Sequence, residues 1–191
     1  NAEDIAAVDQ KVNAHLNETM QYGQIELTVG SGGDFDTINS ALEYLSKKYP
    51  SYVTSPTNKT IAVIRLLSGF IMQEQVLVKG LNLGWVVIIG DDDKTTINRS
   101  ALTSNFTIDD YNFDSYPAFG VSKGGTLPII GQLFVMDDSG VRVNRHGVMA
   151  VDNSRASILP GCGVQNAGSY GIYANQASII NAVNANASNA G

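Results

Sequence analysis

The chain has 191 residues, enough for one domain or for one domain with an appendage, and 43% of them are hydrophobic. Its formal net charge of −6 argues against a basic surface that binds nucleic-acid phosphates or anionic lipid. The single cysteine excludes an intrachain disulfide framework, and no apolar run is long enough to span a bilayer. We therefore expect no nucleic-acid partner and no membrane insertion.

Residues 1–23 are expected to form a helical neck. Apolar side chains recur there every three or four residues, at Ile5, Val8, Val12, Leu16 and Met20. Such a stripe is too narrow to bury against a large core, but it is the seam that three parallel helices share in a coiled coil. The pattern predicts a homotrimer, and the alternative is a single helix that lies on its own domain.

A glycine-rich turn at residues 30–33 leads into a short amphipathic helix, predicted at residues 37–49. Its apolar positions fall on one face: Ile38, Ala41, Leu42, Leu45 and Tyr49. Asp36 or Thr37 can act as the N-cap, and Pro50 blocks continuation. No Gly-Lys-Ser/Thr follows the glycines, so we interpret them as a turn and not as a phosphate loop. This helix should cover the end of a β-stack.

Short β-branched and apolar runs surround that helix. They lie at residues 24–29, 60–70, 75–78, 85–90 and 95–97, and Gly, Asn or Asp residues bound them. Asp91, Asp92 and Asp93 are adjacent, but nothing supplies further calcium ligands at a known spacing. We interpret them as a solvated turn and expect neither a metal nor a cofactor.

Three stretches carry a resemblance to a known family: GGDFDTINSAL at 32–42, IRLLSGFI at 64–71 and VVIIGDDDKTTI at 86–97. Their order resembles the opening of pectin-lyase-like right-handed β-helix proteins, which include pectin methylesterases and many bacteriophage tailspikes. The resemblance implies an all-β, right-handed parallel β-helix over residues 24–191 with an N-terminal capping helix. It covers roughly residues 30–98 and indicates the fold, because the same opening precedes many chemistries.

Residues 99–125 interrupt the strand pattern with a long segment rich in aromatic and acidic residues. Aromatic faces stack on sugar C–H groups, and carboxylates accept hydrogen bonds from sugar hydroxyls. The candidate carbohydrate-binding residues are Asp109, Asp110, Tyr111, Phe113, Asp114 and Tyr116. The alternative is that these aromatics fill a gap between protomers.

The end of the chain repeats. Residues 126–140 align without a gap with residues 177–191, Ala156-Ser-Ile recurs at 177, a step of 21, and Gly147-Val148 recurs as Gly171-Ile172, a step of 24. Periods of about 20–25 residues fit one turn of a parallel β-helix. Because the sequence closes on a repeat with no capping segment, we expect it to be the N-terminal part of a longer β-helix.

No catalytic residue is assigned from the sequence. Hydrolysis needs two suitably spaced carboxylates, for which Asp109, Asp110 and Asp114 are candidates. A lyase needs a base beside a positive charge, and Arg142, Arg145 and His146 could supply such a basic edge, unless they are a solvated strand edge. The glutamine and aspartate series of the pectin methylesterases is absent from residues 125–191, so esterase activity is not inferred.

These patterns lead to three competing functions. The first is a virion tailspike or tail fibre that attaches to host surface polysaccharide, with a depolymerase role as an open extension and other phage tail or baseplate proteins as partners. The second is a structural connector of the phage tail, and the third is a free polysaccharide-active enzyme. The expected neck and the lack of a signal peptide favour the first two, and with them a location at the virion tail.

Overall fold

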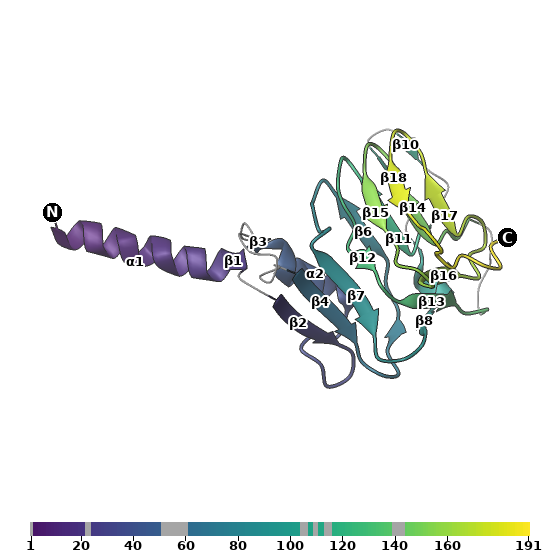
Figure 1. The fold of residues 1–191 in the computed structure, drawn as a ribbon, viewed down its shortest axis with the longest axis horizontal. Helices are drawn as coiled ribbons and strands as arrows, with labels where there is room; N and C mark the ends of the chain where they lie inside the picture. Colours follow the sequence, from purple (N-terminus) through teal and green to yellow (C-terminus); the bar gives the residue numbers. More distant parts are fainter. Residues whose placement is uncertain are drawn as a thin grey trace.

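A computed structural model describes residues 2–21, 24–50, 61–103, 107–108, 111–112, 116–138 and 144–191 (Figure 1). The fold is mostly sheet, with parallel strands in stacked sheets. Its helices in the described residues are α1 (Ala2–Thr19), α2 (Ile38–Ser46) and the 3-10 turn η1 (Arg99–Ala101).

Three four-stranded parallel sheets form the body. The first sheet contains β2 (Gln24–Val29), β4 (Ile61–Leu66), β7 (Val86–Gly90) and β12 (Ile129–Ile130). The second sheet contains β5 (Ile71–Met72), β8 (Thr95–Ile97), β13 (Leu133–Met136) and β16 (Gly163–Gln165). The third sheet contains β6 (Val76–Lys79), β11 (Phe119–Ser122), β14 (Val148–Ala150) and β17 (Ile172–Ala174).

Three smaller pairings complete the strands. β15 (Arg155–Ser157) pairs with β18 (Ile179–Asn181), and an isolated bridge from Ile130 to Ile158 links this pair to the first sheet. β1 (Met20–Gln21) pairs in parallel with β3 (Tyr49–Pro50). β9 (Thr107–Ile108) and β10 (Tyr111–Asn112) form an antiparallel pair inside the 99–125 segment.

From β4 onward the chain visits the three sheets in turn, one strand in each, and then returns to the first. Ala62 pairs with Val86 and Val148 pairs with Ile172, each 24 residues further along. The recurrence of Gly147-Val148 at 171 therefore marks the true register. Where the chain passes through residues 99–125 the step is longer, and Val76 pairs with Phe119.

The other repeat alignments are wrong in register. Ala156 lies opposite Ile180, not opposite Ala177, so the step here is 24 and not 21. Ala177 occupies a corner with a positive φ of 57°, before the strand begins. Thr126 bridges to Arg155, which pairs with Ile179, so the gap-free alignment of 126 with 177 is displaced by two residues. Small side chains recur at corners as well as in strands, and this misleads a comparison by residue type.

The core lies between the three sheets, and α2 covers its N-terminal end. Four of the five residues predicted on the buried face are buried: Ile38, Ala41, Leu42 and Leu45. Each buried Leu or Ile contributes about 1.5–3 kcal/mol through the apolar surface it removes from water. Tyr49, the fifth, is 66% exposed, because α2 ends at Ser46 and Tyr49 is already extended in β3.

The start of α2 is held by two side chains. Thr37 is the N-cap, and its hydroxyl oxygen accepts a hydrogen bond from Ser40 N–H. The Glu74 carboxylate, in the turn between β5 and β6, accepts from the N–H groups of Ile38 at 2.6 Å and Asn39 at 3.0 Å. A carboxylate at the positive end of the helix dipole is favourable, so Glu74 fixes α2 to the stack.

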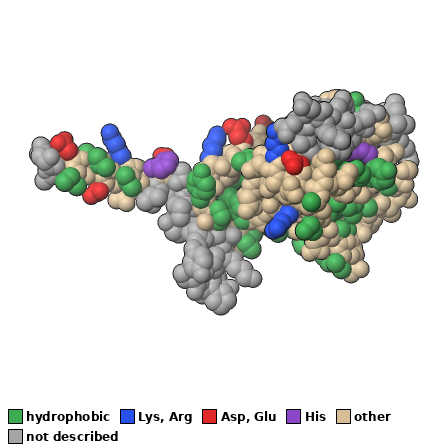
Figure 2. Space-filling model, turned by 90° about the horizontal axis from the view of Figure 1, so that it is seen from above, with side chains coloured by type: hydrophobic (Ala, Val, Ile, Leu, Met, Phe, Trp, Pro, Cys, Tyr) green, Lys and Arg blue, Asp and Glu red, His purple; other side chains and the backbone are tan. Residues whose placement is uncertain are grey.

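The helix α1 projects away from the sheets and does not lie on them (Figures 1 and 2). Its stripe is solvent-exposed in the single chain, with Ile5 65%, Val8 58% and Val12 50% exposed. Lys48 Nζ donates to the carbonyl oxygen of Glu18 at 2.9 Å and helps to join α1 to the end of α2. Neither α1 nor any other described helix is long and apolar enough to cross a membrane.

Candidate functional site

The strongest candidate site is a group of aromatic and basic side chains where the chain enters the third sheet. We call Tyr116, Arg145, His146, Tyr170 and Tyr173 the aromatic cluster. Tyr116 precedes β11, Arg145 and His146 precede β14, Tyr170 precedes β17 and Tyr173 lies within β17. Three successive passes of the chain therefore contribute to one surface.

Backbone hydrogen bonds hold these passes side by side. Tyr116 N–H donates to the carbonyl of Asn144 at 2.7 Å, and Gly147 N–H donates to that of Tyr170 at 2.9 Å. Glycine is required at 147, since a Cβ there would collide with the carbonyl oxygen of Gly171. The close approach of two glycines thus brings their aromatic neighbours together.

The rings of the aromatic cluster are in direct contact. The guanidinium carbon of Arg145 lies 4.1 Å from the centroid of the Tyr116 ring, a cation–π geometry. The His146 ring is stacked with that of Tyr173 at 6.1 Å and 10°, and the Tyr170 ring lies 5.4 Å from His146 and 5.3 Å from Tyr173. Two adjoining aromatic surfaces result, one of which carries a positive charge.

His146 is the buried foundation of the aromatic cluster, and Tyr170 is its exposed part. The imidazole is 8% exposed, whereas Tyr170 is 55% exposed. The Nδ1 atom of His146 accepts a hydrogen bond from Tyr170 N–H at 3.2 Å, which assigns the proton of the neutral ring to Nε2. His146 therefore positions its neighbours and does not present a free base at Nδ1.

The aromatic cluster continues onto the outer face of the third sheet. Tyr173 lies opposite Met149 in the β14–β17 register, and both pack with Leu77 and Val151 in a small apolar group. Met149 and Val151 are 1% and 0% exposed although they alternate with the inward-facing Val148 and Ala150. This outer face is therefore apolar and well packed.

The structure brings together only some of the residues predicted from the sequence. Tyr116 lies in the aromatic cluster beside Arg145 and His146, which joins two sites that were predicted separately. Tyr111 is described only by its backbone in β10. Asp109, Asp110, Phe113 and Asp114 lie outside the described residues, as does Arg142.

Tyr170 and Tyr173 were not predicted as site residues. The signal was present in the 24-residue recurrence, because it places residue 170 beside 146 and residue 173 beside 149. A register based on that step would have extended the predicted basic edge to both tyrosines.

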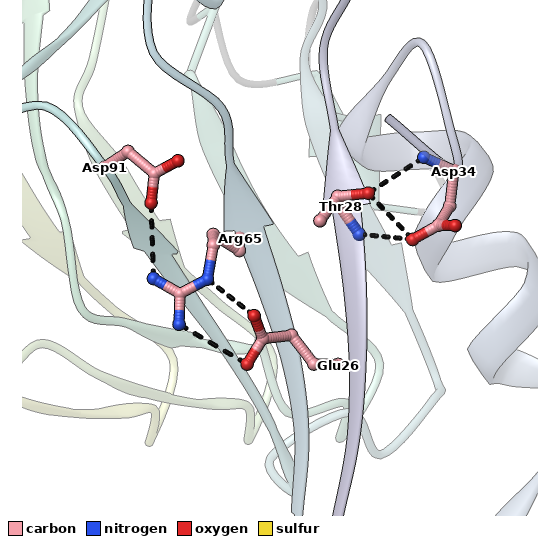
Figure 3. Close-up of polar contacts among 5 residues, drawn as sticks. All are labelled: Glu26, Thr28, Asp34, Arg65 and Asp91. Carbon is pink, nitrogen blue, oxygen red and sulfur yellow. Dashed lines mark hydrogen bonds and ion pairs between the residues drawn. The ribbon is translucent and has the colours of Figure 1, made fainter. Parts of the chain in front are cut away.

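A second polar group lies on the outer face of the first sheet (Figure 3). Arg65 donates to both oxygens of Glu26, at 2.6 and 3.3 Å, and to Asp91 Oδ1 at 3.2 Å. These hydrogen bonds hold the pKa of Glu26 below its ordinary value. This arrangement is a salt-bridged ladder across β2, β4 and the end of β7, and its charges are mutually satisfied.

The acidic turn at residues 91–93 belongs to the same surface. Asp92 accepts hydrogen bonds from Gly69 N–H and from the Ser68 hydroxyl, both at 2.7 Å, and these lower the pKa of its carboxyl. With Asp91 paired to Arg65, two of the three carboxylates serve the protein itself. In the described part of the chain, no three His, Cys, Asp or Glu side chains are grouped as a metal site would need.

The chain matches no protein-family model and no curated protein sequence. Functional inference therefore depends on the stacked sheets, the projecting α1 and the aromatic cluster.

Proposed function

We propose that this chain is the N-terminal part of a bacteriophage tailspike or tail fibre that attaches the virion to host surface polysaccharide. We further propose that its stacked parallel sheets form a right-handed, pectin-lyase-like β-helix. The cyclic order of the sheets and the cover over one end of the core by α2 support this fold. On this proposal the protein resides at the virion tail and meets other tail or baseplate proteins.

The aromatic cluster is the observation that carries the attachment proposal. Tyr170 offers an exposed ring, and the Tyr116 ring lies beneath a guanidinium group. Sugar C–H groups pack on such rings, while tyrosine hydroxyl and arginine N–H groups bind sugar hydroxyls. Because His146 and Tyr173 support the exposed ring from behind, the surface is ordered before a ligand arrives.

A homotrimer through residues 3–20 completes the proposal. The exposed Ile5, Val8 and Val12 on the projecting α1 support a shared seam between parallel helices. Each ring contributes only about 0.5–1.5 kcal/mol beyond its buried area, so one site would bind weakly. Three linked sites on a repetitive polysaccharide raise the apparent affinity by about 10²–10⁴.

A structural connector of the phage tail is the second candidate. The extension of α1 away from the stack favours it, since a helical neck can join two parts without any ligand. Depolymerase chemistry would need two carboxylates about 5 Å or 6.5–9.5 Å apart. Its candidates Asp109, Asp110 and Asp114 lie outside the described residues, so we propose attachment and assign no hydrolysis.

The two functions are separated by a double substitution, Tyr116→Ala with Tyr170→Ala. The probes are immobilised capsular polysaccharides and O-antigens from a panel of bacterial hosts. We expect the wild-type chain to bind at least one of them and the variant to bind about 5- to 150-fold more weakly, from the loss of two stacking rings.

The matched control is Tyr49→Ala, which removes an exposed tyrosine remote from the aromatic cluster and should leave binding unchanged. Melting temperatures of all three proteins show whether they remain folded. Wild-type binding to no polysaccharide of the panel, or equal losses in the control and the double variant, would reject attachment through the aromatic cluster and favour the connector.

A further inference from the structure

A groove runs between α2 and β6, at the end of the stack from which α1 leaves. It consists of two adjoining hollows of about 280 and 230 Å³, which share Ser46, Leu81 and Leu83. Residues of α2 line one side and residues of β6 the other, with Tyr49 and Trp85 at one end. We call it the α2–β6 groove.

The surface of the α2–β6 groove is apolar and incompletely covered. Leu81, which lines both hollows, is 49% exposed, and Tyr49 is 66% exposed. Two polar groups at the groove already have partners within the chain: the Ser46 hydroxyl donates to the Glu43 carbonyl, and Lys48 Nζ donates to the Glu18 carbonyl. The α2–β6 groove is therefore suited to apolar side chains and poorly suited to a sugar or an anion.

The wall formed by β6 is also the edge of the third sheet. Val76 N–H donates to the carbonyl of Ala118 and Gly80 N–H to that of Ser122, so these groups face β11. Because N–H and C=O groups alternate in direction along a strand, those of Leu77 face the other way, toward the free edge. An unpaired strand edge beside an apolar groove is the arrangement to which proteins add an extended peptide.

The first sheet shows what such an addition looks like. There β2 pairs with β4 on the side that faces the end of the stack, over six residues from Gln24 to Val29. In the third sheet, the described residues provide no strand at the corresponding position beside β6. The α2–β6 groove lies where that strand would run.

We propose that the α2–β6 groove binds an extended peptide segment of a partner protein, which pairs with β6 and places alternate apolar side chains against Leu81 and Leu83. A strand of four or five residues is about 13–17 Å long, which matches the four residues of β6. Tyr49 and Pro50 line the groove and pair with β1 at the base of the neck. A protein that meets the neck would thus lie beside the groove. The inference does not depend on carbohydrate binding.

The test uses the whole chain as the target for a displayed library of random dodecapeptides. Bound clones are assayed on two variants: Ser46→Trp, which places a large side chain in both hollows, and Lys47→Trp, the matched control, which adds the same side chain at a solvent-exposed position. We expect the library to yield clones with alternating apolar residues that lose about tenfold or more in affinity for Ser46→Trp and bind Lys47→Trp normally.

Two further measurements make the result decisive. Leu81→Asp, at a half-exposed position, should weaken the same clones without a large loss of stability, which covers the case in which Ser46→Trp does not fold. Synthetic peptides N-methylated along the edge that faces β6 should bind about tenfold more weakly or worse, and those methylated along the opposite edge should bind normally. No clone sensitive to either groove variant, or equal binding of both methylated series, would overturn the proposal.

Discussion

The Nδ1 atom of His146 accepts a hydrogen bond from the backbone N–H of Tyr170, 3.2 Å away, across two successive passes of the chain. This contact fixes the imidazole behind the exposed tyrosine ring. It also satisfies a backbone donor that would otherwise have no partner in a crowded region.

Replacement of His146 by Ala should therefore destabilise the protein and weaken polysaccharide binding together. The loss of a buried ring and of the acceptor for Tyr170 N–H should cost about 2–4 kcal/mol of the free energy of unfolding. Denaturant unfolding followed by tryptophan fluorescence measures it. The exposed His15 in α1 provides the control, since His15→Ala should change the unfolding free energy by less than about 0.5 kcal/mol. Equal effects of the two changes would contradict a supporting role for His146.

Glu74→Ala should detach α2 from the end of the stack. Two backbone N–H groups lose a charged acceptor, and the expected cost is about 2–4 kcal/mol of unfolding free energy. Glu74→Gln keeps one oxygen acceptor and should have an intermediate effect. The control is Glu43→Ala, which breaks an exposed i,i+4 pair with Lys47 and should cost about 0.3–0.5 kcal/mol. Amide hydrogen exchange in residues 38–46 should accelerate in Glu74→Ala alone.

Stability should fall as the pH is lowered below about 4, because three acidic groups have lowered pKa values in the folded state. Backbone N–H donors from Thr28 and Gly69 lower the pKa of Asp34 and Asp92, and the Arg65 side chain lowers that of Glu26. A lowered pKa means that the folded state binds the proton less readily than the unfolded chain. The stability is present above the ordinary carboxyl pKa and is lost as the pH falls.

Melting temperatures between pH 7 and pH 3 test this dependence. The double variant Asp34→Asn with Asp92→Asn should melt lower than wild type at pH 7, and the difference should shrink at pH 3. Glu74 acts in the opposite sense, because burial raises its pKa even though two N–H donors act against the shift. Its contribution is largest at low pH and falls as the pH rises, so Glu74→Gln should steepen the acid loss. A constant difference between the double variant and wild type would reject the assignment.

Val8→Asp should convert a trimer into monomers. Val8 is 58% exposed in the single chain, and a carboxylate in a three-helix seam would bring three negative charges together. Light scattering at micromolar concentration should give three times the chain mass for wild type and one chain mass for the variant. Gln10→Asp adds the same charge on the opposite face of α1 and should leave the trimer intact. A monomeric wild-type protein would contradict the proposed seam.

The sequence was sufficient for elements whose pattern is local. The bounds of β2 and β8 and the buried face of α2 follow from periodicity within a few residues, and the structure confirms them. The pattern failed at Tyr49, where a distant residue decides: Met20 pairs with Tyr49 in parallel, so the chain is extended there and the helix ends at Ser46.

The site was less predictable, because its members are joined by register and not by proximity in sequence. Tyr116 contacts Arg145, and His146 contacts Tyr170 and Tyr173, over separations of 24 to 29 residues. Composition alone drew attention to the densest run of aromatics and acids, at 106–119, and missed the two tyrosines of the last circuit. Which residues share a surface depended on the corner geometry, such as the positive φ of Ala177.

The long circuit between β8 and β11 has an evolutionary consequence. β8 pairs with β5 and β13, and β11 pairs with β6 and β14, in the same parallel manner as strands joined by short circuits. The number of residues between Ile97 and Phe119 therefore places no demand on the register of either sheet. Selection can lengthen, shorten or exchange this segment while the sheets keep their pairing. Related chains can thus diverge in what they recognise at this position and retain a common architecture.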